Sequence, residues 1–177
     1  MAVYQGVLTN SPDYPIRAAT RNELPVLAAL ADRVWRAYYP GIISPGQIEY
    51  MLGRGYAIPT LEAELESGVL FPLLFDRQNA VGFGAYGPTG TPLQAKLHKL
   101  YLDTDYHGLG LGQRLLDWIE SSAHSNRYTR LVLQVNKNNT RAIAAYQRKG
   151  YAIEREVVDD IGHGYLMDDY VMEKSIA

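Results

Sequence analysis

The sequence predicts an α/β protein built on one mixed sheet. Short apolar runs separated by turn residues, at 69–76 and 80–87, are typical of two strands joined in an antiparallel hairpin. Farther along the chain, strand-like runs alternate with segments of helical periodicity, which favours strand-helix-strand units. With 177 residues, 47% of them hydrophobic, the chain can fill one core. We therefore expect an irregular tail at 1–13 and a single domain at 14–177.

The domain is expected to begin with a strand at about 14–19. From 23 to 38 the apolar residues follow helical spacing, which predicts a helix with one buried stripe. Pro25 is compatible with this helix because it falls in the first turn, where no intrahelical N–H partner is needed.

A second helix has an unusually complete start signal. Ser44 is placed as the N-cap, Pro45 occupies the first helical position, and Gln47 is spaced to close a capping box. A short helix through Leu52 is therefore expected.

After these helices the pattern changes from helical to strand-like. Thr60 can cap a third helix, which stops at Gly68. The later elements are expected in this order: a hairpin of 69–76 with 80–87, a strand at about 95–102, a helix at 110–124, a strand at 131–135, a helix at 139–149, and a terminal hairpin of 154–160 with 165–174.

Composition argues against several classes of protein. The chain has no cysteine and four scattered histidines, so we expect neither thiol chemistry nor a metal site. A formal net charge of −2 argues against a nucleic-acid-binding surface. The sequence shows no secretory leader and no run of about 18 apolar residues, which predicts a cytoplasmic protein without a membrane segment.

The segment 97–116, LHKLYLDTDYHGLGLGQRLL, is the most informative part of the chain. A predicted strand leads into Gly108, Gly110 and Gly112, and an amphipathic helix follows directly. Glycines at this spacing let backbone amides of a turn and a helix N-terminus point at one anion without Cβ obstruction. A phosphate or pyrophosphate is the expected ligand.

Three phosphate-binding loops are compared with this segment. A P-loop needs Lys and then Ser or Thr after its last glycine, but Gln113 and Arg114 follow Gly112. A dinucleotide fingerprint needs a different glycine spacing and an acidic residue on the next strand, and the LVLQV strand has no acid. The third loop binds the pyrophosphate of acyl-coenzyme A in N-acetyltransferases, and His107, Gly110 and Gly112 fit it except that His107 replaces Gln or Arg.

Through this loop and a second motif the chain resembles the GNAT superfamily of N-acetyltransferases. The second motif is NNTRAIAAYQRKGY at 138–151, where an Asn precedes a helix that bears a Tyr and ends at Gly plus an aromatic. The resemblance covers about residues 15–174. It implies a GNAT-like α/β fold, with a mostly antiparallel central sheet of about seven strands flanked by four to five helices, and acetyl-coenzyme A as the cofactor. The residues that carry the second motif are Asn139, Ala142, Tyr146, Gly150 and Tyr151.

The resemblance also implies which residues hold the cofactor. Backbone amides from 109 to 113 would bind the pyrophosphate, the strand edge at 100–102 would pair with the pantetheine arm, and the nucleotide end would lie near Asn139 and Arg148. The implied cofactor-binding residues are Leu100, Tyr101, Leu102, His107, Gly108, Leu109, Gly110, Leu111, Gly112, Gln113, Asn139, Tyr146 and Arg148.

Two catalytic roles are expected. In the family, the phenol at the position of Tyr146 protonates the departing thiolate, and an unperturbed phenol with a pKa of about 10 still carries its proton at pH 7. His98 is the first candidate to accept the proton of the attacking amine, because a neutral imidazole accepts at physiological pH. A purely structural His98 is equally compatible with the sequence. Removal of the proton through water by Glu49 or by an Asp of the terminal hairpin is the alternative.

An acceptor pocket is expected between the first two helices, with Trp35, Tyr38 and Tyr39 as its candidate walls. Trp35 and Tyr38 also fit the buried stripe of the helix, whereas Tyr39 lies off it. The terminal hairpin concentrates negative charge, as a solvated face or as a rim that attracts a cationic amine. Its acidic residues are Asp159, Asp160, Asp168 and Asp169.

These observations predict an N-acetyltransferase that moves an acetyl group to a primary amine by direct attack in a ternary complex. The acceptor is a small molecule or a peptide or protein amine, and the exposed edge of the terminal hairpin is a candidate homodimer surface. The alternative function is a non-catalytic acyl-coenzyme A sensor of the same fold. A filled acceptor pocket would favour that alternative.

Overall fold

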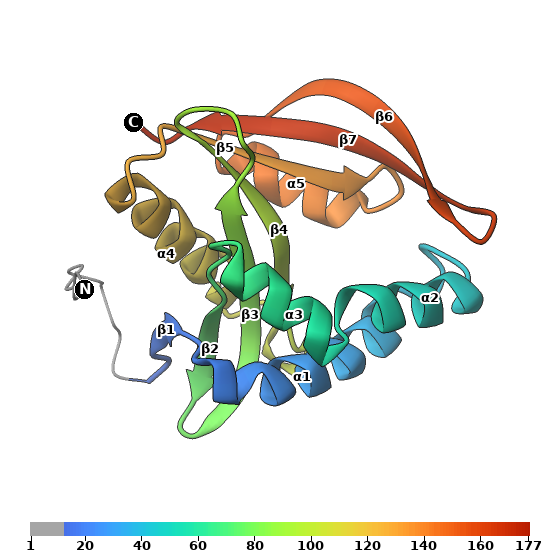
Figure 1. Ribbon diagram of the computed structural model, residues 1–177, viewed down its shortest axis with the longest axis horizontal. Helices are drawn as coiled ribbons and strands as arrows, with labels where there is room; N and C mark the ends of the chain where they lie inside the picture. Colours follow the sequence, from blue (N-terminus) through green and yellow to red (C-terminus); the bar gives the residue numbers. More distant parts are fainter. Residues whose placement is uncertain (1–12) are drawn as a thin grey trace.

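The computed structural model describes residues 13–177, so the expected tail at 1–13 lies almost entirely outside the described residues. A seven-stranded sheet in the order β1-β2-β3-β4-β5-β7-β6 forms the centre (Figure 1). All neighbours are antiparallel except β4 and β5, which are parallel. The predicted fold class is confirmed. The strands are β1 (Ile16–Ala18), β2 (Pro72–Asp76), β3 (Asn79–Pro88), β4 (Gln94–Leu102), β5 (Arg130–Asn136), β6 (Ala152–Gly162) and β7 (Tyr165–Ser175).

Five α-helices cover the two faces of the sheet (Figure 1). The first three pack on one face and the last two on the other, each over its own cluster of buried side chains. None of the helices within residues 13–177 combines the length and apolar character that crossing a bilayer requires. The helices are α1 (Leu24–Tyr38), α2 (Pro45–Gly55), α3 (Ile58–Glu66), α4 (Leu111–Ser125) and α5 (Thr140–Arg148).

The helical stripes that the sequence predicts are the ones that fill the core. Leu24 and Leu27 of α1 are buried over one face of the sheet, and Leu115 and Ile119 of α4 are buried over the other. Full burial of one such side chain contributes about 1.5–3 kcal/mol relative to an exposed one. The two clusters therefore anchor both helices firmly against the sheet between them.

The predicted starts of α2 and α3 are confirmed only in part. Ser44 caps α2 as expected, since its Oγ accepts a hydrogen bond from Gln47 N at 3.2 Å. The capping box does not close, because Gln47 Nε2 donates instead to Leu166 O on β7, and α2 runs to Gly55 rather than to Leu52. The prediction of Thr60 as the cap of α3 is wrong. The helix begins earlier, at Ile58, with a proline in its first turn.

The two parallel strands of the sheet, β4 and β5, are paired along only part of their length. Hydrogen-bonded pairing of β4 with β5 ends at Leu97 and Leu133, although β4 continues to Leu102 and β5 to Asn136. The register of β3 against β4 also shifts at this level, so that His98 is an extra residue of β4 without a partner on β3. Such a β-bulge bends the strand and re-aims its side chains. The two strands therefore diverge, and the candidate site lies where they part.

Candidate functional site

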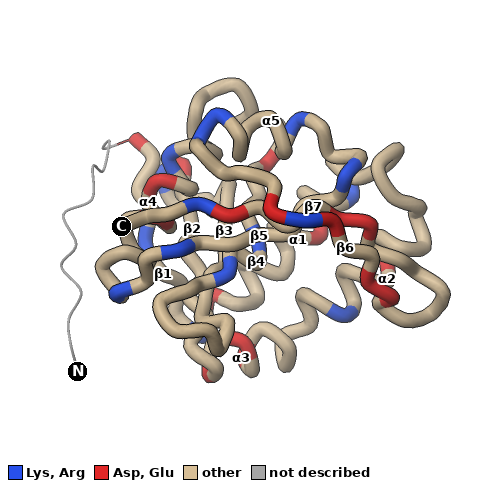
Figure 2. The backbone as a smooth tube through the Cα atoms, turned by 90° about the horizontal axis from the view of Figure 1, so that it is seen from above, with Lys and Arg blue, Asp and Glu red and all other residues tan. Residues whose placement is uncertain are grey.

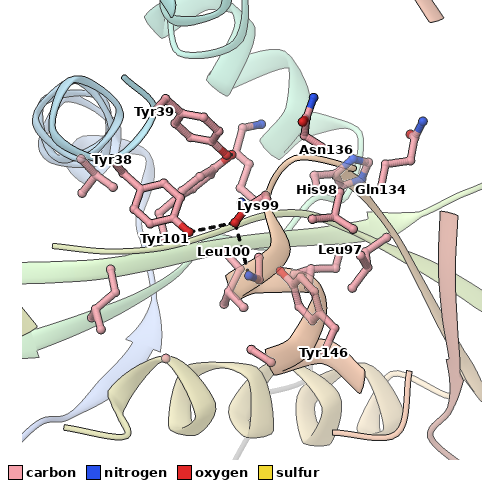
Figure 3. Close-up of a pocket in the computed structure, with 18 of the residues that line it drawn as sticks. Tyr38, Tyr39, Leu97, His98, Lys99, Leu100, Tyr101, Gln134, Asn136 and Tyr146 are labelled. Atoms are coloured by element: carbon pink, nitrogen blue, oxygen red, sulfur yellow. Dashed lines mark hydrogen bonds between the residues drawn. The ribbon is translucent and has the colours of Figure 1, made fainter. Parts of the chain in front are cut away.

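A cavity of about 820 Å³ occupies the space between the diverging strands. It runs from the glycine loop before α4, past β4, to the walls formed by α1, α2 and the β6–β7 hairpin. Figure 3 shows its centre, with side chains from α1, β4, β5 and α5 converging on one space. We describe first the half beside α4 and α5, and then the half beside α1 and α2.

The glycine loop is shaped as its spacing predicts. Gly108 and Gly110 have φ values of 83° and 74°, in the left-handed region that glycine adopts at least cost. A Cβ at either position, or at Gly112, would meet no atom within 4 Å outside the adjoining chain. The loop therefore presents its backbone to open space, and that space belongs to the cavity.

The N-terminus of α4 is left without a cap. Its N-cap is Gly110, and no side chain among residues 13–177 accepts a hydrogen bond from its first turn. By contrast, Ser44 caps α2 and Asn139 caps α5, while α1 and α3 have a proline in the first turn. The first-turn N–H groups of α4 have no intrahelical acceptors, and the helix dipole adds favourable potential for an anion there. The arrangement suits a phosphate group.

Two expected ligand residues of the loop differ from the others: the His107 ring lines the cavity but is held against the end of β4, and the Leu109 side chain does not line the cavity. His107 Nε2 lies 3.1 Å from Leu102 O, so the imidazole turns back and fastens the loop to the end of β4. Its ring also meets the ring of Tyr38 edge-on at 6.0 Å. The Leu109 side chain is 59% exposed and does not line the cavity, so it can contribute only its backbone.

The remaining expected cofactor residues line the same half of the cavity. Beyond Leu97, the edge of β4 that faces β5 has no hydrogen-bonded partner strand, and an extended ligand can pair with it. Asn139 is buried, and its Oδ1 accepts from Ala142 N and from the Tyr38 hydroxyl, which ties α1 to α5 across the cavity. Those residues that line the cavity are Leu100, Tyr101, Leu102, His107, Gly108, Gly110, Leu111, Gly112, Gln113, Asn139, Tyr146 and Arg148.

Tyr146 lies at the junction of the two halves. Its ring rises from α5 toward Leu97 and Leu100 of β4 (Figure 3) and packs against Tyr151 at 5.6 Å. Burial raises the pKa of the Tyr146 phenol above its ordinary value. The phenol therefore keeps its proton throughout the physiological range and is available as a donor.

His98 opens onto the cavity from the bulge in β4 (Figure 3). Desolvation by the surrounding protein lowers the pKa of the His98 imidazole to about 4, and the positive charges of Lys96 and Lys99 contribute to the same shift. The imidazole is therefore neutral at pH 7 and has a nitrogen lone pair available. Its low pKa makes it a weak base.

Aromatic side chains form the wall that α1 contributes. Trp35 stacks on Tyr39 with ring centroids 4.3 Å apart, and its Nε1 donates to Tyr56 OH at 3.1 Å. The Tyr39 hydroxyl donates to Tyr101 OH at 3.4 Å, and burial raises the pKa of both phenols. Trp35 is thus a core residue that also lines the cavity. Tyr38 and Tyr39 line it as well.

An ion pair that no sequence motif predicts lies in the floor of this half. Lys99 is only 8% exposed, and its Nζ donates to Glu64 Oε1 at 2.7 Å, 35 residues away on α3. Lys99 also lies above the rings of Tyr56 and Phe71. A charged residue inside a strand is a weak signal by itself, because only the tertiary contact with Glu64 shows that it is buried.

Most of the expected carboxylates lie away from the cavity. Glu49 is 60% exposed and pairs with Arg36, so the prediction that it relays the amine's proton is wrong. Asp160 accepts from Gly162 N at 2.8 Å within the hairpin turn. Asp168 pairs with Lys137 at 2.6 Å and does not line the cavity. Only Asp159 and Asp169 of the four hairpin acids line it.

Polar groups of three strands meet beside these two acids. Lys96 donates to Gln134 Oε1, and Gln134 Nε2 donates to Asp159 Oδ2 at 3.0 Å. Asn136 lines the same wall (Figure 3). Lys96, Gln134 and Asn136 were not among the residues expected from the sequence, although the alternation of polar and apolar residues in LVLQVN was an available signal for the two on β5. Within residues 13–177, no group of three His, Asp or Glu side chains is placed to hold a metal ion.

Comparison with known families gives one match to the region that builds the cavity. Residues 29–151 match the family described as Acetyltransferase (GNAT) family. The matched range includes the glycine loop, both diverging strands and α5.

Individual proteins resemble the chain in sequence or fold. Peptidyl-lysine N-acetyltransferase YjaB of Salmonella typhimurium is 30% identical over 102 residues, which make up 57% of this chain and 63% of that relative. The crystal structure of paia N-acetyltransferase from Thermoplasma acidophilum, in complex with coenzyme A, has a TM-score of 0.78 at 24% identity and covers 92% of this chain and 98% of its own. Ribosomal-protein-alanine N-acetyltransferase from Brucella melitensis has a TM-score of 0.66 at 21% identity, with coverage of 91% and 99%.

Proposed function

The chain belongs to the GNAT family of acetyltransferases, and we propose that it transfers an acetyl group from acetyl-coenzyme A to a primary amine by direct attack in a ternary complex. The acceptor is an amine of a small molecule or of a peptide, the latter being the kind of substrate that the name of the Salmonella relative describes. A cytoplasmic location is part of the same proposal.

One observation carries this proposal: an uncapped helix N-terminus with an open glycine cradle lies next to an unpaired strand edge. The cradle suits a pyrophosphate, and the strand edge suits the amide-containing pantetheine arm, so the chain's own residues fit coenzyme A. Leu111, Gly112 and Gln113 would donate backbone N–H groups to the pyrophosphate. Asn139 and Arg148 would lie toward the nucleotide.

When bound, acetyl-coenzyme A supplies the acetyl group as a reactive thioester. We assign Tyr146 the role of proton donor to the departing thiolate, because its buried phenol is protonated and rises toward the gap between β4 and β5. The thiolate is a better leaving group when its charge is quenched.

We assign His98 the role of proton acceptor at the amine. An imidazole with a pKa near 4 cannot compete for the proton of an ammonium with a pKa of about 10. It can accept a proton once the nitrogen has begun to bond to the acyl carbon, since bonding makes that nitrogen far more acidic. The amine must therefore reach the site as the free base.

The open acceptor half favours an enzyme over a coenzyme A sensor. A sensor needs no space beyond the acyl group, whereas this cavity continues past His98 to Asp159 and Asp169. We also propose that the exposed edge strand β6 is a homodimer surface, because its outer edge has no partner strand in the sheet.

A thiol-release assay with acetyl-coenzyme A against a panel of primary amines tests the proposed function. We expect thiol release that depends on the amine and equals the amount of N-acetylated product found by mass spectrometry. Binding of coenzyme A without transfer to any amine would favour the sensor. Absence of both binding and transfer would refute both functions.

A further inference from the structure

We propose that Asp169 binds a second, non-reacting ammonium group of the acceptor, so that the enzyme selects linear diamines or longer polyamines over monoamines. This inference rests on the proposed function and names the substrate class for the same cavity.

Asp169 is a buried acid with unused hydrogen-bonding capacity. It is 1% exposed, and its Oδ1 has no hydrogen-bond partner among residues 13–177. It nevertheless lines the cavity. A buried carboxylate without a partner is costly, and the cost is recovered only when a cation or hydrogen-bond donors reach it. The cavity is the route by which a ligand can do so.

The cations near Asp169 are already occupied by other groups. Lys96, on β4, donates to Gln134, which in turn donates to Asp159. Lys137, after β5, pairs with Glu156 and Asp168, the latter being the neighbour of Asp169 on β7.

Asp159 and Asp168 add to the negative potential at this carboxylate, while Lys96 and Lys137 only partly offset it. Figure 2 shows acidic segments gathered on β6 and β7 where the hairpin passes α2. The local charge therefore favours a cationic ligand.

Asp169 and His98 approach the cavity from separate strands, β7 and β4, with β5 between them. Asp169 pairs with Asn136 on β5, three residues beyond the last β4–β5 pair at Leu133. β7 lies two strand spacings from β4, and Asp169 lies farther along the sheet than His98. Together these two offsets put the Asp169 backbone on the order of 10 Å from the β4 bulge at His98. Lys96 affects the pKa of both His98 and Asp169 and lies near each of them. An acceptor that reaches both sites needs two nitrogens separated by several carbon atoms.

The test compares kcat/KM for 1,5-diaminopentane and 1-aminopentane, two probes that differ only in the second amine. The wild type should prefer the diamine, and Asp169→Asn should lower the ratio of the two kcat/KM values by about 30-fold or more, as removal of one partner of a buried charge pair does. Asp168→Asn is the matched control. It is the same substitution one residue away, at a side chain that is 56% exposed and paired with Lys137, so it removes only a small part of the negative potential and the ratio should fall far less than in Asp169→Asn.

A second measurement uses the wild type alone. Since the buried Asp169 has its pKa raised to about 6, the diamine preference should be complete at pH 8 and should fall as the pH drops through 6 and the carboxylate is protonated. Both probes carry amines of similar pKa, so the ratio cancels the titration of the reacting amine.

Two results would overturn the inference while leaving the proposed function intact. The first is acetyl transfer with no preference for the diamine. The second is a ratio that Asp169→Asn does not change, and an equal loss for both probes would then make Asp169 part of the proton-transfer step instead. Absence of transfer to every amine would contradict the proposed function itself.

Discussion

The half of the cavity beside α4 is formed largely by the backbone of one contiguous loop, whereas the half beside α1 and α2 is formed by side chains from separate elements. The loop offers amides that cannot be removed by substitution, at glycines with φ values of 74° and 83°. The other half offers ionisable groups that are buried at a cost, such as Lys99 and Asp169. The first half suits a ligand of fixed chemistry. In the second half, a single amino-acid substitution can change which ligand is bound.

The largest expected effect is at the loop. Gly110→Asp should abolish measurable coenzyme A binding in calorimetry, a loss of at least about 100-fold, because it places a negative side chain where the pyrophosphate lies. Gly110→Asn is the matched control, since Asn has nearly the same shape, no charge and a similar tolerance of the left-handed conformation. If Asp and Asn weaken binding equally, charge is not the cause. If neither weakens it, the loop does not hold the pyrophosphate.

The next effect concerns the junction of the two halves. Tyr146→Phe should lower single-turnover transfer by about 10²- to 10⁴-fold, the usual contribution of general acid catalysis, with little change in the Kd for acetyl-coenzyme A. The ring and its packing on Tyr151 are retained, so only the proton donor is lost. A rate within about twofold of the wild type, with chemistry rate-limiting, would return Tyr146 to a packing role.

A smaller effect should appear in stability rather than in rate. The pKa of Asp169 rises from 3.8 to about 6 on folding, so the folded state binds more protons than the unfolded state between these values. Wild-type stability therefore falls as pH rises from about 4 to 6. Asp169→Asn should raise the free energy of unfolding by about 1–3 kcal/mol at pH 7 and by much less at pH 4. Urea unfolding at both pH values measures this.

The control for stability is again Asp168→Asn, which removes an exposed ion pair and should change stability by no more than about 1 kcal/mol. A pH-independent gain for Asp169→Asn would show that Asp169 is not the group responsible for the pH dependence. A loss of stability at pH 7 would show that its carboxylate has a stabilising partner.

The smallest effect is expected at His98. His98→Ala should lower kcat/KM by about tenfold near neutral pH, the modest contribution of a weak base, and part of the loss should disappear at higher pH, where hydroxide or a buffer base can accept the proton in place of the imidazole. His124→Ala, in the last turn of α4, is the control. A loss for His98→Ala that is flat across pH would assign His98 to packing.

The sequence was sufficient to predict the half beside α4. Gly110, Gly112 and the Asn139 cap lie within short motifs whose geometry depends on neighbouring residues, and local sequence fixes such turns and helix starts. The seven strands and their mixed pairing could also be predicted, because the periodicity changes are strong. Predictions from local sequence were wrong where a residue distant in the chain competes for the same hydrogen-bonding group. Gln47 was expected to close a capping box, but it bonds to Leu166 O, 119 residues away.

The acceptor half could be predicted only in outline. The sequence marked four hairpin acids as one group, yet the alternation of side chains along β7 separates Asp168 from Asp169, and the two end in different surroundings. Glu49 was a candidate base until its pairing with Arg36 placed it outside the cavity. The Lys99 and Glu64 pair depends on how α3 packs on the sheet. Such contacts are set by tertiary packing, which can hardly be predicted from a single sequence.

The most direct test of the two-part cavity is an amide NMR titration of the wild-type protein, first with coenzyme A and then with 1,5-diaminopentane. We predict that coenzyme A shifts the amides of 108–113 and of the β4 edge at 100–102, and that the diamine then shifts β7 around Asp169 without displacing coenzyme A. Unchanged loop amides at saturating coenzyme A, or displacement of coenzyme A by the diamine, would contradict the account.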